Sequence, residues 1–244
     1  MESLGLGSSS EQLRRTALFF LGWTMLQLGS ERLAPKSLSS AEKSKFSKLC
    51  VQLCHAVSTS VISSYIIATP EEDPAVTEDH LYGFSDRINL LFAHSCAYFL
   101  WDTYCELSKK KANFGFIGHG IACFLCYLFG QYPFLHFYGV RFLQFELSSP
   151  FLNIVGLFRL LRLERHPFYK YLQGTFGLTF LVVRIIYGFP LSYHFFQETI
   201  RLLQNGSAHN FGVLGYYMVS NLALNALNLT WLVLMIGKFK PEKS

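Results

Sequence analysis

Long apolar runs separated by short polar connections dominate the chain. Seven runs stand out, at 16–29, 49–68, 88–104, 114–130, 133–157, 174–196 and 211–237. Most of them approach the roughly 20 residues that a helix needs to cross the hydrocarbon of a bilayer. The first run is shorter, and a run of that length can also lie at the membrane interface. The pattern predicts an all-α, polytopic integral membrane protein with about seven transmembrane helices.

Composition supports this fold class and narrows the function. Hydrophobic residues make up 51% of the chain and charged residues 15%, against about 25% charged residues in an average soluble domain. The net charge is +5, but the basic residues form no continuous stripe, so nucleic acid is not an expected partner. The six cysteines lie in or beside apolar runs. Cys123 and Cys126 form a C-x-x-C spacing without a second pair, and we expect no metal or cofactor.

Lysine and arginine are concentrated in alternate connections between the runs. Fifteen of the 21 lie in the connections 30–48, 105–113 and 158–173 and in the tail after the last run. Short loops rich in positive charge stay on the cytosolic side. We therefore expect a cytosolic C-terminus and, with seven spans, an N-terminus on the other side. A glycosylation sequon at 205–207 lies on that other side in this topology.

Polar residues recur three or four positions apart in three of the runs, and this spacing places them on one helix face. The stripes are Gln52, His55, Thr59 and Ser63; His94, Tyr98 and Asp102; and Tyr217, Asn221, Asn225 and Asn228. Three such helices favour an inward-facing polar cavity, because lipid leaves polar groups unsatisfied. The alternative is that the stripes make hydrogen bonds between packed helices, and that His55 and His94 are packing residues.

Four ionisable residues fall inside or at the ends of the runs: Asp102, Arg141, Glu146 and Arg184. An ionised side chain at mid-membrane costs about 2.5–3.5 kcal/mol when it faces lipid. These side chains should therefore point inward or reach toward the membrane surface. Glu146 and Arg141 are five positions apart, which is poor spacing for a helical pair. We predict an ion pair between Glu146 and Arg184 instead.

Three segments stand out: KLCVQLCHAVSTSVISSYII at 48–67, AHSCAYFLWDTYCEL at 93–107 and the histidine-containing span at 115–154. They resemble segments of the TLC domain family of lipid-handling proteins. The resemblance is nearer to the small TLC domain-containing transmembrane proteins than to ceramide synthases. It implies a six-helix core around a lipid-sized cavity. The implied division is an N-terminal tail and first span at 1–39, a TLC domain at 40–237 and a basic cytosolic tail at 238–244.

The resemblance also suggests site residues. Ceramide synthases transfer an acyl chain from acyl-CoA to a sphingoid amine with adjacent histidines and downstream acids. His119 matches the first histidine, whereas Gly120 stands where the second would be. Glu146 alone matches the later acids, and Asp102 matches the acid of an earlier span. A neutral imidazole can act as nucleophile or base when partners orient it, but these departures argue against ceramide synthesis.

These observations support three functional hypotheses. The first is a protein of membrane lipid metabolism or homeostasis that binds a lipid or acyl chain in an intramembrane cavity. The second is an acyltransferase-like enzyme with acyl-CoA as substrate, His119 as the nucleophile or base, and Glu146 and Asp102 as orienting acids. The third is a transporter or channel. The expected cavity-lining residues are His55, His94, Tyr98, Arg141, Asn153, Arg184, Asn221 and Asn225.

The remaining expectations concern partners and compartment. Membrane lipids are the expected partners. Assembly into a homo-oligomer is a further possibility that the sequence leaves undecided. The endoplasmic reticulum is the compartment implied by the resemblance.

Overall fold

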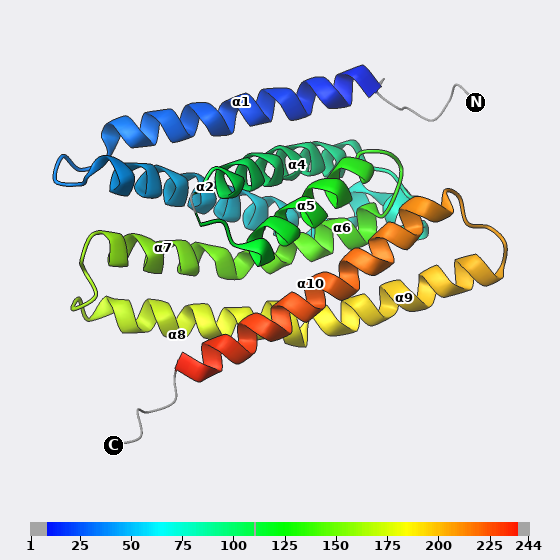
Figure 1. The fold of residues 1–244 in the computed structure, drawn as a ribbon. Helices are drawn as coiled ribbons and strands as arrows, with labels where there is room; N and C mark the ends of the chain where they lie inside the picture. Colours follow the sequence, from blue (N-terminus) through cyan, green and yellow to red (C-terminus); the bar gives the residue numbers. More distant parts are fainter. Residues whose placement is uncertain (1–8, 110, 239–244) are drawn as a thin grey trace.

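The chain folds into a bundle of long helices joined by short connections (Figure 1). The computed structural model describes residues 9–109 and 111–238, and this part of the chain contains no strand. Each of the seven apolar runs falls within one helical segment, apart from at most three residues at an end. Five segments are uninterrupted: α1 (Ser9–Leu33), α2 (Ser40–Ala68), α4 (Asp86–Leu107), α5 (Phe114–Phe129) and α10 (Phe211–Lys238). The all-α membrane architecture predicted from the sequence is confirmed.

Length and composition alone identify fewer spans than the sequence pattern did. Within the described residues, three helices are long and apolar enough to cross a membrane: Ser40–Ala68, Phe168–Gln204 and Phe211–Gly237. α5 is apolar but has 16 residues. α1 is longer than its apolar run because it continues into polar residues at both ends. These polar ends are used in packing, since Gln12 donates to the Gln131 carbonyl over 2.7 Å.

Two of the seven segments are irregular. The run at 133–157 forms α6 (His136–Phe142), the 3₁₀ segment η2 (Leu143–Ser148) and α7 (Ser149–Leu160). Pro150 lies in the first turn of α7, where its missing N–H costs nothing. The run at 174–196 forms α8 (Phe168–Phe180), the π-helical segment η3 (Leu181–Ile186) and α9 (Gly188–Gln204). Such irregular turns often occur at functional sites because they redirect side chains.

The connections lie at two ends of the bundle. The basic-loop end holds the α1–α2 and α7–α8 connections, and the acidic-loop end holds the 69–85 connection and the α9–α10 connection (Figure 1). At the acidic-loop end the Tyr82 hydroxyl accepts a hydrogen bond from the His209 amide over 2.8 Å. The charge alternation in the sequence thus corresponds to a separation in space. The tail at 239–244 and residues 1–8 lie outside the described residues.

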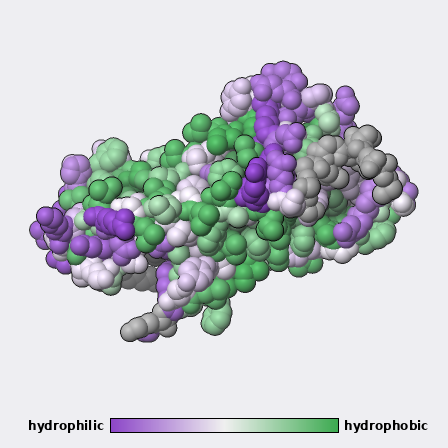
Figure 2. All heavy atoms as spheres, turned by 90° about the horizontal axis from the view of Figure 1, so that it is seen from above, coloured by the Kyte–Doolittle hydropathy of each residue, from purple (hydrophilic) through white to green (hydrophobic). Residues whose placement is uncertain are grey.

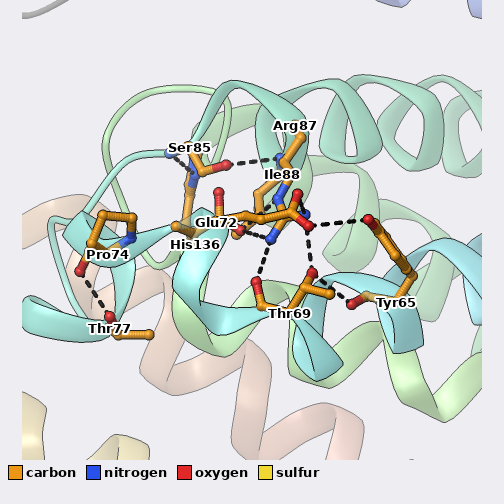
Figure 3. Close-up of polar contacts among 10 residues, drawn as sticks. Tyr65, Thr69, Glu72, Pro74, Thr77, Ser85, Arg87, Ile88 and His136 are labelled. Atoms are coloured by element: carbon orange, nitrogen blue, oxygen red, sulfur yellow. Dashed lines mark hydrogen bonds and ion pairs between the residues drawn. The ribbon is translucent and has the colours of Figure 1, made fainter.

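Arg87 orders the acidic connection after α2, which contains η1 (Pro70–Glu72) and α3 (Pro74–Glu78). Its guanidinium binds Glu72 and the Thr69 carbonyl, the latter at 2.7 Å (Figure 3). It also binds Asp73 at 2.5 Å. The hydrogen bond to Asp73 raises the pKa of Arg87. This segment is therefore pinned to the start of α4.

The outer surface matches the membrane setting. The face in Figure 2 has a broad hydrophobic middle, with hydrophilic residues gathered at its left end and in a second group right of centre. Large apolar side chains are exposed on several helices, including Leu18, Leu21, Val61, Val219 and Val233. Apolar exposure of this extent is typical of a surface that faces lipid. The core lies among α1, α2, α4 and α5 and includes Trp101, Phe92 and Cys96.

Candidate functional site

Two adjoining cavities lie among the irregular segments, α5 and α10. The wide cavity measures about 610 Å³ and the narrow cavity about 90 Å³. Both contain apolar and polar lining residues. Four residues line both cavities and mark the place where they meet: Phe99, His119, Glu146 and Arg184. We call this set the junction.

His119 reaches the junction from α5. Its ring lies edge-on to Phe99 and Trp231, with centroids 6.0 and 5.5 Å apart. The Cys123 sulfur, one turn along the same helix, is 3.8 Å from His119 Nε2 and 3.9 Å from Nδ1. No carboxylate within residues 9–109 and 111–238 makes a hydrogen bond to this imidazole. Aromatic packing and a long contact with Cys123 therefore orient His119, and no carboxylate in the described part of the chain competes with a ligand for its ring nitrogens.

Glu146 and Arg184 form the predicted ion pair. Arg184 Nη2 is 3.9 Å from Glu146 Oε1, and the two side chains are only 9% and 12% exposed. Neutral groups hold the guanidinium more closely, because it donates to Ser148 Oγ over 3.3 Å and to Asn228 Oδ1 over 3.2 Å. Glu146 belongs to η2 and Arg184 to η3. The two irregular segments thus bring opposite charges to one buried point.

Asp102 lines the wide cavity but is engaged by α2. Its carboxylate is 3.1 Å from Lys48 Nζ and accepts a hydrogen bond from Gln52 Nε2 over 3.0 Å. Lys48 also lies 3.4 Å from Glu106. Asp102 therefore has its own cation and makes no hydrogen bond to His119. This geometry does not supply the orienting contact to His119 that the family resemblance suggested.

The other predicted polar residues divide between the two cavities. Tyr98 and Asn153 line the wide cavity, and Asn221 and Asn225 line the narrow cavity. Asn225 donates to Ser192 Oγ and to Asn221 Oδ1, each over 2.9 Å. The amides of α10 therefore bind one another and α9.

His55 and His94 lie outside both cavities. His55 is completely buried and stacks on Tyr98, with centroids 3.5 Å apart. Trp23 of α1 packs against both imidazoles at centroid distances of 5.8 and 4.9 Å. The structure does not bring these two residues to either cavity, because α1 covers this side of α2 and α4. The packing alternative describes them instead.

Arg141 also lies outside both cavities. Its guanidinium lies 3.4 Å from the centroid of the Phe137 ring and donates to the Phe137 carbonyl over 2.9 Å. The side chain is partly exposed. The structure therefore does not bring Arg141 to either cavity, because the side chain folds back over its own helix.

Gly120 explains why a second histidine is absent. A Cβ at this position would lie 2.2 Å from Thr103 Oγ1, because α4 and α5 pack closely there. Position 120 therefore faces α4, whereas His119 faces the cavities. A histidine pair of the ceramide synthase kind has no room here unless α4 changes as well.

Sequence reasoning missed part of the site. Ser148, Asn228 and Trp231 surround Arg184 or His119, and only Asn228 had belonged to a polar stripe. No signal in the sequence marks Trp231, since it is one of many aromatic residues in an apolar run. Within the described residues, no group of three or more histidines, cysteines or acids is arranged to hold a metal ion.

Comparison of the sequence with known proteins identifies the family of this chain. The sequence profile of the TLC domain matches residues 45–237. An uncharacterized TLC domain-containing protein of Schizosaccharomyces pombe is 30% identical over 163 residues, which cover 66% of this chain and 55% of that protein. Another from Saccharomyces cerevisiae is 29% identical over 148 residues, which cover 57% of this chain and 45% of that protein.

Human TLC domain-containing protein 4 is 26% identical over 217 residues, covering 84% of this chain and 78% of that protein. The chain spans about half the length of the two yeast relatives. The matched profile includes most of α2, all of α4, α5 and both irregular segments, and nearly all of α10. The junction residues and the helices that carry them all lie within it. The chain therefore belongs to the TLC domain family.

Proposed function

We propose that this protein binds a membrane lipid, with an acyl chain in the wide cavity and a polar group of the lipid at the junction. One observation carries the proposal: a cavity of about 610 Å³ lies among the helices and is bordered by buried polar groups at the junction. Its volume falls within the range of about 300–1,000 Å³ that is typical of small-molecule sites.

The lining suits an amphipathic ligand. Apolar side chains form much of the wall, including Phe116, Leu152, Val155, Phe176 and Met235. His119, Glu146 and Arg184 can exchange hydrogen bonds with a carbonyl or hydroxyl group at the junction. Buried polar groups of this kind are costly unless a partner satisfies them. A lipid ester, amide or hydroxyl group would be such a partner.

Native mass spectrometry of the full chain in mild detergent tests this proposal. Ser149→Leu adds bulk to the wall of the wide cavity, whereas Gly174→Leu on α8 has open space around it. We expect wild type and Gly174→Leu to retain a bound lipid and Ser149→Leu to retain at least several-fold less. Equal retention in all three proteins, or wild type free of lipid, would contradict the proposal.

A second candidate is an acyltransferase-like reaction with acyl-CoA as the acyl donor. The position of His119 at the meeting point of two cavities favours it, because a nucleophile or base there would meet a ligand from either side. Lipidomics of cells that express wild type or His119→Ala separates the candidates. Enzymatic turnover predicts a lipid change that requires His119, whereas simple binding predicts no new product.

Membrane orientation and compartment are part of the proposal. We place the C-terminus in the cytosol and the protein in the endoplasmic reticulum. Asn205 lies in the exposed α9–α10 connection, followed by Gly206 with a φ of +66°. Glycosylation at Asn205 that is lost in Asn205→Gln and removed by endoglycosidase H would support both statements. A protein that is modified only when a sequon is added after residue 238 would contradict the orientation.

A further inference from the structure

Arg141 is an unmatched cation at the edge of the transmembrane part. Within residues 9–109 and 111–238, no carboxylate lies within 4.0 Å of its guanidinium, and its one hydrogen bond is to the Phe137 carbonyl. A guanidinium has five N–H donors. Most of these donors therefore have no partner in the protein. Arg184, by contrast, is bound by Glu146, Ser148 and Asn228.

Three acids at the acidic-loop end are engaged by other groups. Glu72 binds Arg87 (Figure 3), and Asp73 binds the same guanidinium. Glu198 accepts hydrogen bonds from His80, over 2.9 Å, and from the Tyr138 hydroxyl, over 2.6 Å. None of these three carboxylates pairs with Arg141, and an outside anion can take that place.

The guanidinium is also held in position. Phe137 supports its face at 3.4 Å, and the Phe137 ring is itself stacked on His80 at 3.6 Å. Tyr187 ends the π-helical segment and precedes α9, which packs against α6, and it interacts electrostatically with Arg141. No hydrogen bond occupies the Tyr187 hydroxyl within the described part of the chain, and its side chain is 37% exposed. Arg141 and Tyr187 thus offer donors from two different segments.

The depth of Arg141 fits a lipid headgroup. It lies five residues into the segment that begins at His136, which corresponds to about 7–8 Å along a helix. The segment runs on to Leu160 and is longer than the roughly 30 Å of hydrocarbon. This excess length lets its first turns lie in the interfacial layer. Arginine pairs with phosphate through two parallel hydrogen bonds.

We propose that Arg141 and Tyr187 bind the phosphodiester of a phospholipid in the leaflet at the acidic-loop end. The site is separate from both cavities, and the bound lipid stays within the bilayer. It would hold α6 and α9 together through a lipid that spans the two segments. Inorganic phosphate offers the same chemistry, so the test includes it as a separate ligand.

The test measures lipid binding to the full chain by native mass spectrometry in a phosphate-free buffer. The ligands are phosphatidylglycerol, phosphatidylcholine and diacylglycerol with identical acyl chains. Variants are Arg141→Gln, Arg141→Lys and Tyr187→Phe, with Arg201→Gln as control because Arg201 is an exposed arginine of α9. Charge-assisted hydrogen bonds predict about a tenfold or greater loss of phospholipid affinity in Arg141→Gln.

We expect smaller losses in Arg141→Lys and Tyr187→Phe, and less than a twofold change in Arg201→Gln. Diacylglycerol, which lacks the phosphate, should bind wild type no better than it binds Arg141→Gln. Tyr187→Phe removes one hydroxyl group and keeps the test valid if Arg141→Gln fails to fold. Phospholipid affinity that is unchanged in both variants would overturn the proposal. Displacement of the lipid by millimolar inorganic phosphate would overturn the assignment to a lipid.

Discussion

The two sides of the bundle use histidines in opposite ways. On the packed side, formed by α1, α2 and α4, Trp23 fills the space beside His55 and His94. On the cavity side, α5 and α10 face irregular segments, and His119 borders open volume. Both sides have polar stripes at helical spacing. A polar stripe therefore identifies a buried face, and the covering helix decides whether that face becomes core or cavity.

The difference comes from the regularity of the covering segment. α1 is continuous through 25 residues, so its side chains follow one face and pack closely. The opposing segments change to a 3₁₀ turn at η2 and a π turn at η3. These turns place Glu146 and Arg184 where a continuous α-helix would direct other residues inward. The irregular turns thus account for both the cavities and the buried charges of Glu146 and Arg184.

Removing Trp23 tests the packed side most directly and should have the largest effect. Trp23→Ala deletes a ring that is 8% exposed and contacts both histidines and Tyr98. Large-to-small core substitutions of this size cost about 3–5 kcal/mol. Thermal and denaturant unfolding in detergent should show this loss. Leu18→Ala, at an exposed position of the same helix, serves as the control. A loss below about 1 kcal/mol would mean that α1 does not close this side.

Breaking the ion pair tests the cavity side and should cost somewhat less. Arg184→Gln leaves Glu146 buried without its cation, which costs about 3–5 kcal/mol in a closed interior. We expect the lower end of that range, about 3 kcal/mol, because the cavities give Glu146 access to water or ligand. Unfolding of the two single variants and the double variant with Glu146→Gln measures the coupling.

The double variant should recover part of the stability lost in Arg184→Gln. The charge exchange, Glu146→Arg with Arg184→Glu, should likewise be more stable than either reversed charge alone. Additive losses without recovery would show that Ser148 and Asn228, and not Glu146, hold the guanidinium.

Adding a methyl group at Gly120 tests how closely α4 and α5 must pack. The new Cβ would lie 2.2 Å from Thr103 Oγ1, a hydroxyl that donates to the Phe99 carbonyl over 2.6 Å. Overpacking of this kind costs about 1–3 kcal/mol. Thr103→Ala should rescue Gly120→Ala, because it removes the clashing atom. Gly118→Ala is the control, since no atom lies near that position. A neutral Gly120→Ala would show that the helices can separate.

The sequence alone indicated most of the helical architecture and part of the site. Apolar runs depend on local composition, so all seven helical segments could be located. The Glu146–Arg184 pair could be inferred because two charges in lipid need a partner. The placement of His55, His94 and Arg141 could not be inferred. It depends on which helix covers α2 and α4 and on the fold-back of one side chain over Phe137, and neither is a property of local spacing.

The smallest expected effect comes from replacing a histidine on the packed side. His55→Phe keeps a ring of similar size against Tyr98, and loses one long contact with Ser95 at 3.4 Å. It also removes Nδ1, which is buried without a hydrogen-bond partner. Replacing a poorly paired polar group by an apolar one of the same shape is nearly neutral, so we expect a change within about 1 kcal/mol.

His119→Phe is the matched substitution on the cavity side. It should change the free energy of unfolding little but lower lipid retention in native mass spectrometry, because it removes a polar group at the junction. His55→Phe should leave lipid retention unchanged. If the two variants lost lipid equally, the packed side would share the ligand, and the distinction between a closed and an open half of the bundle would fail.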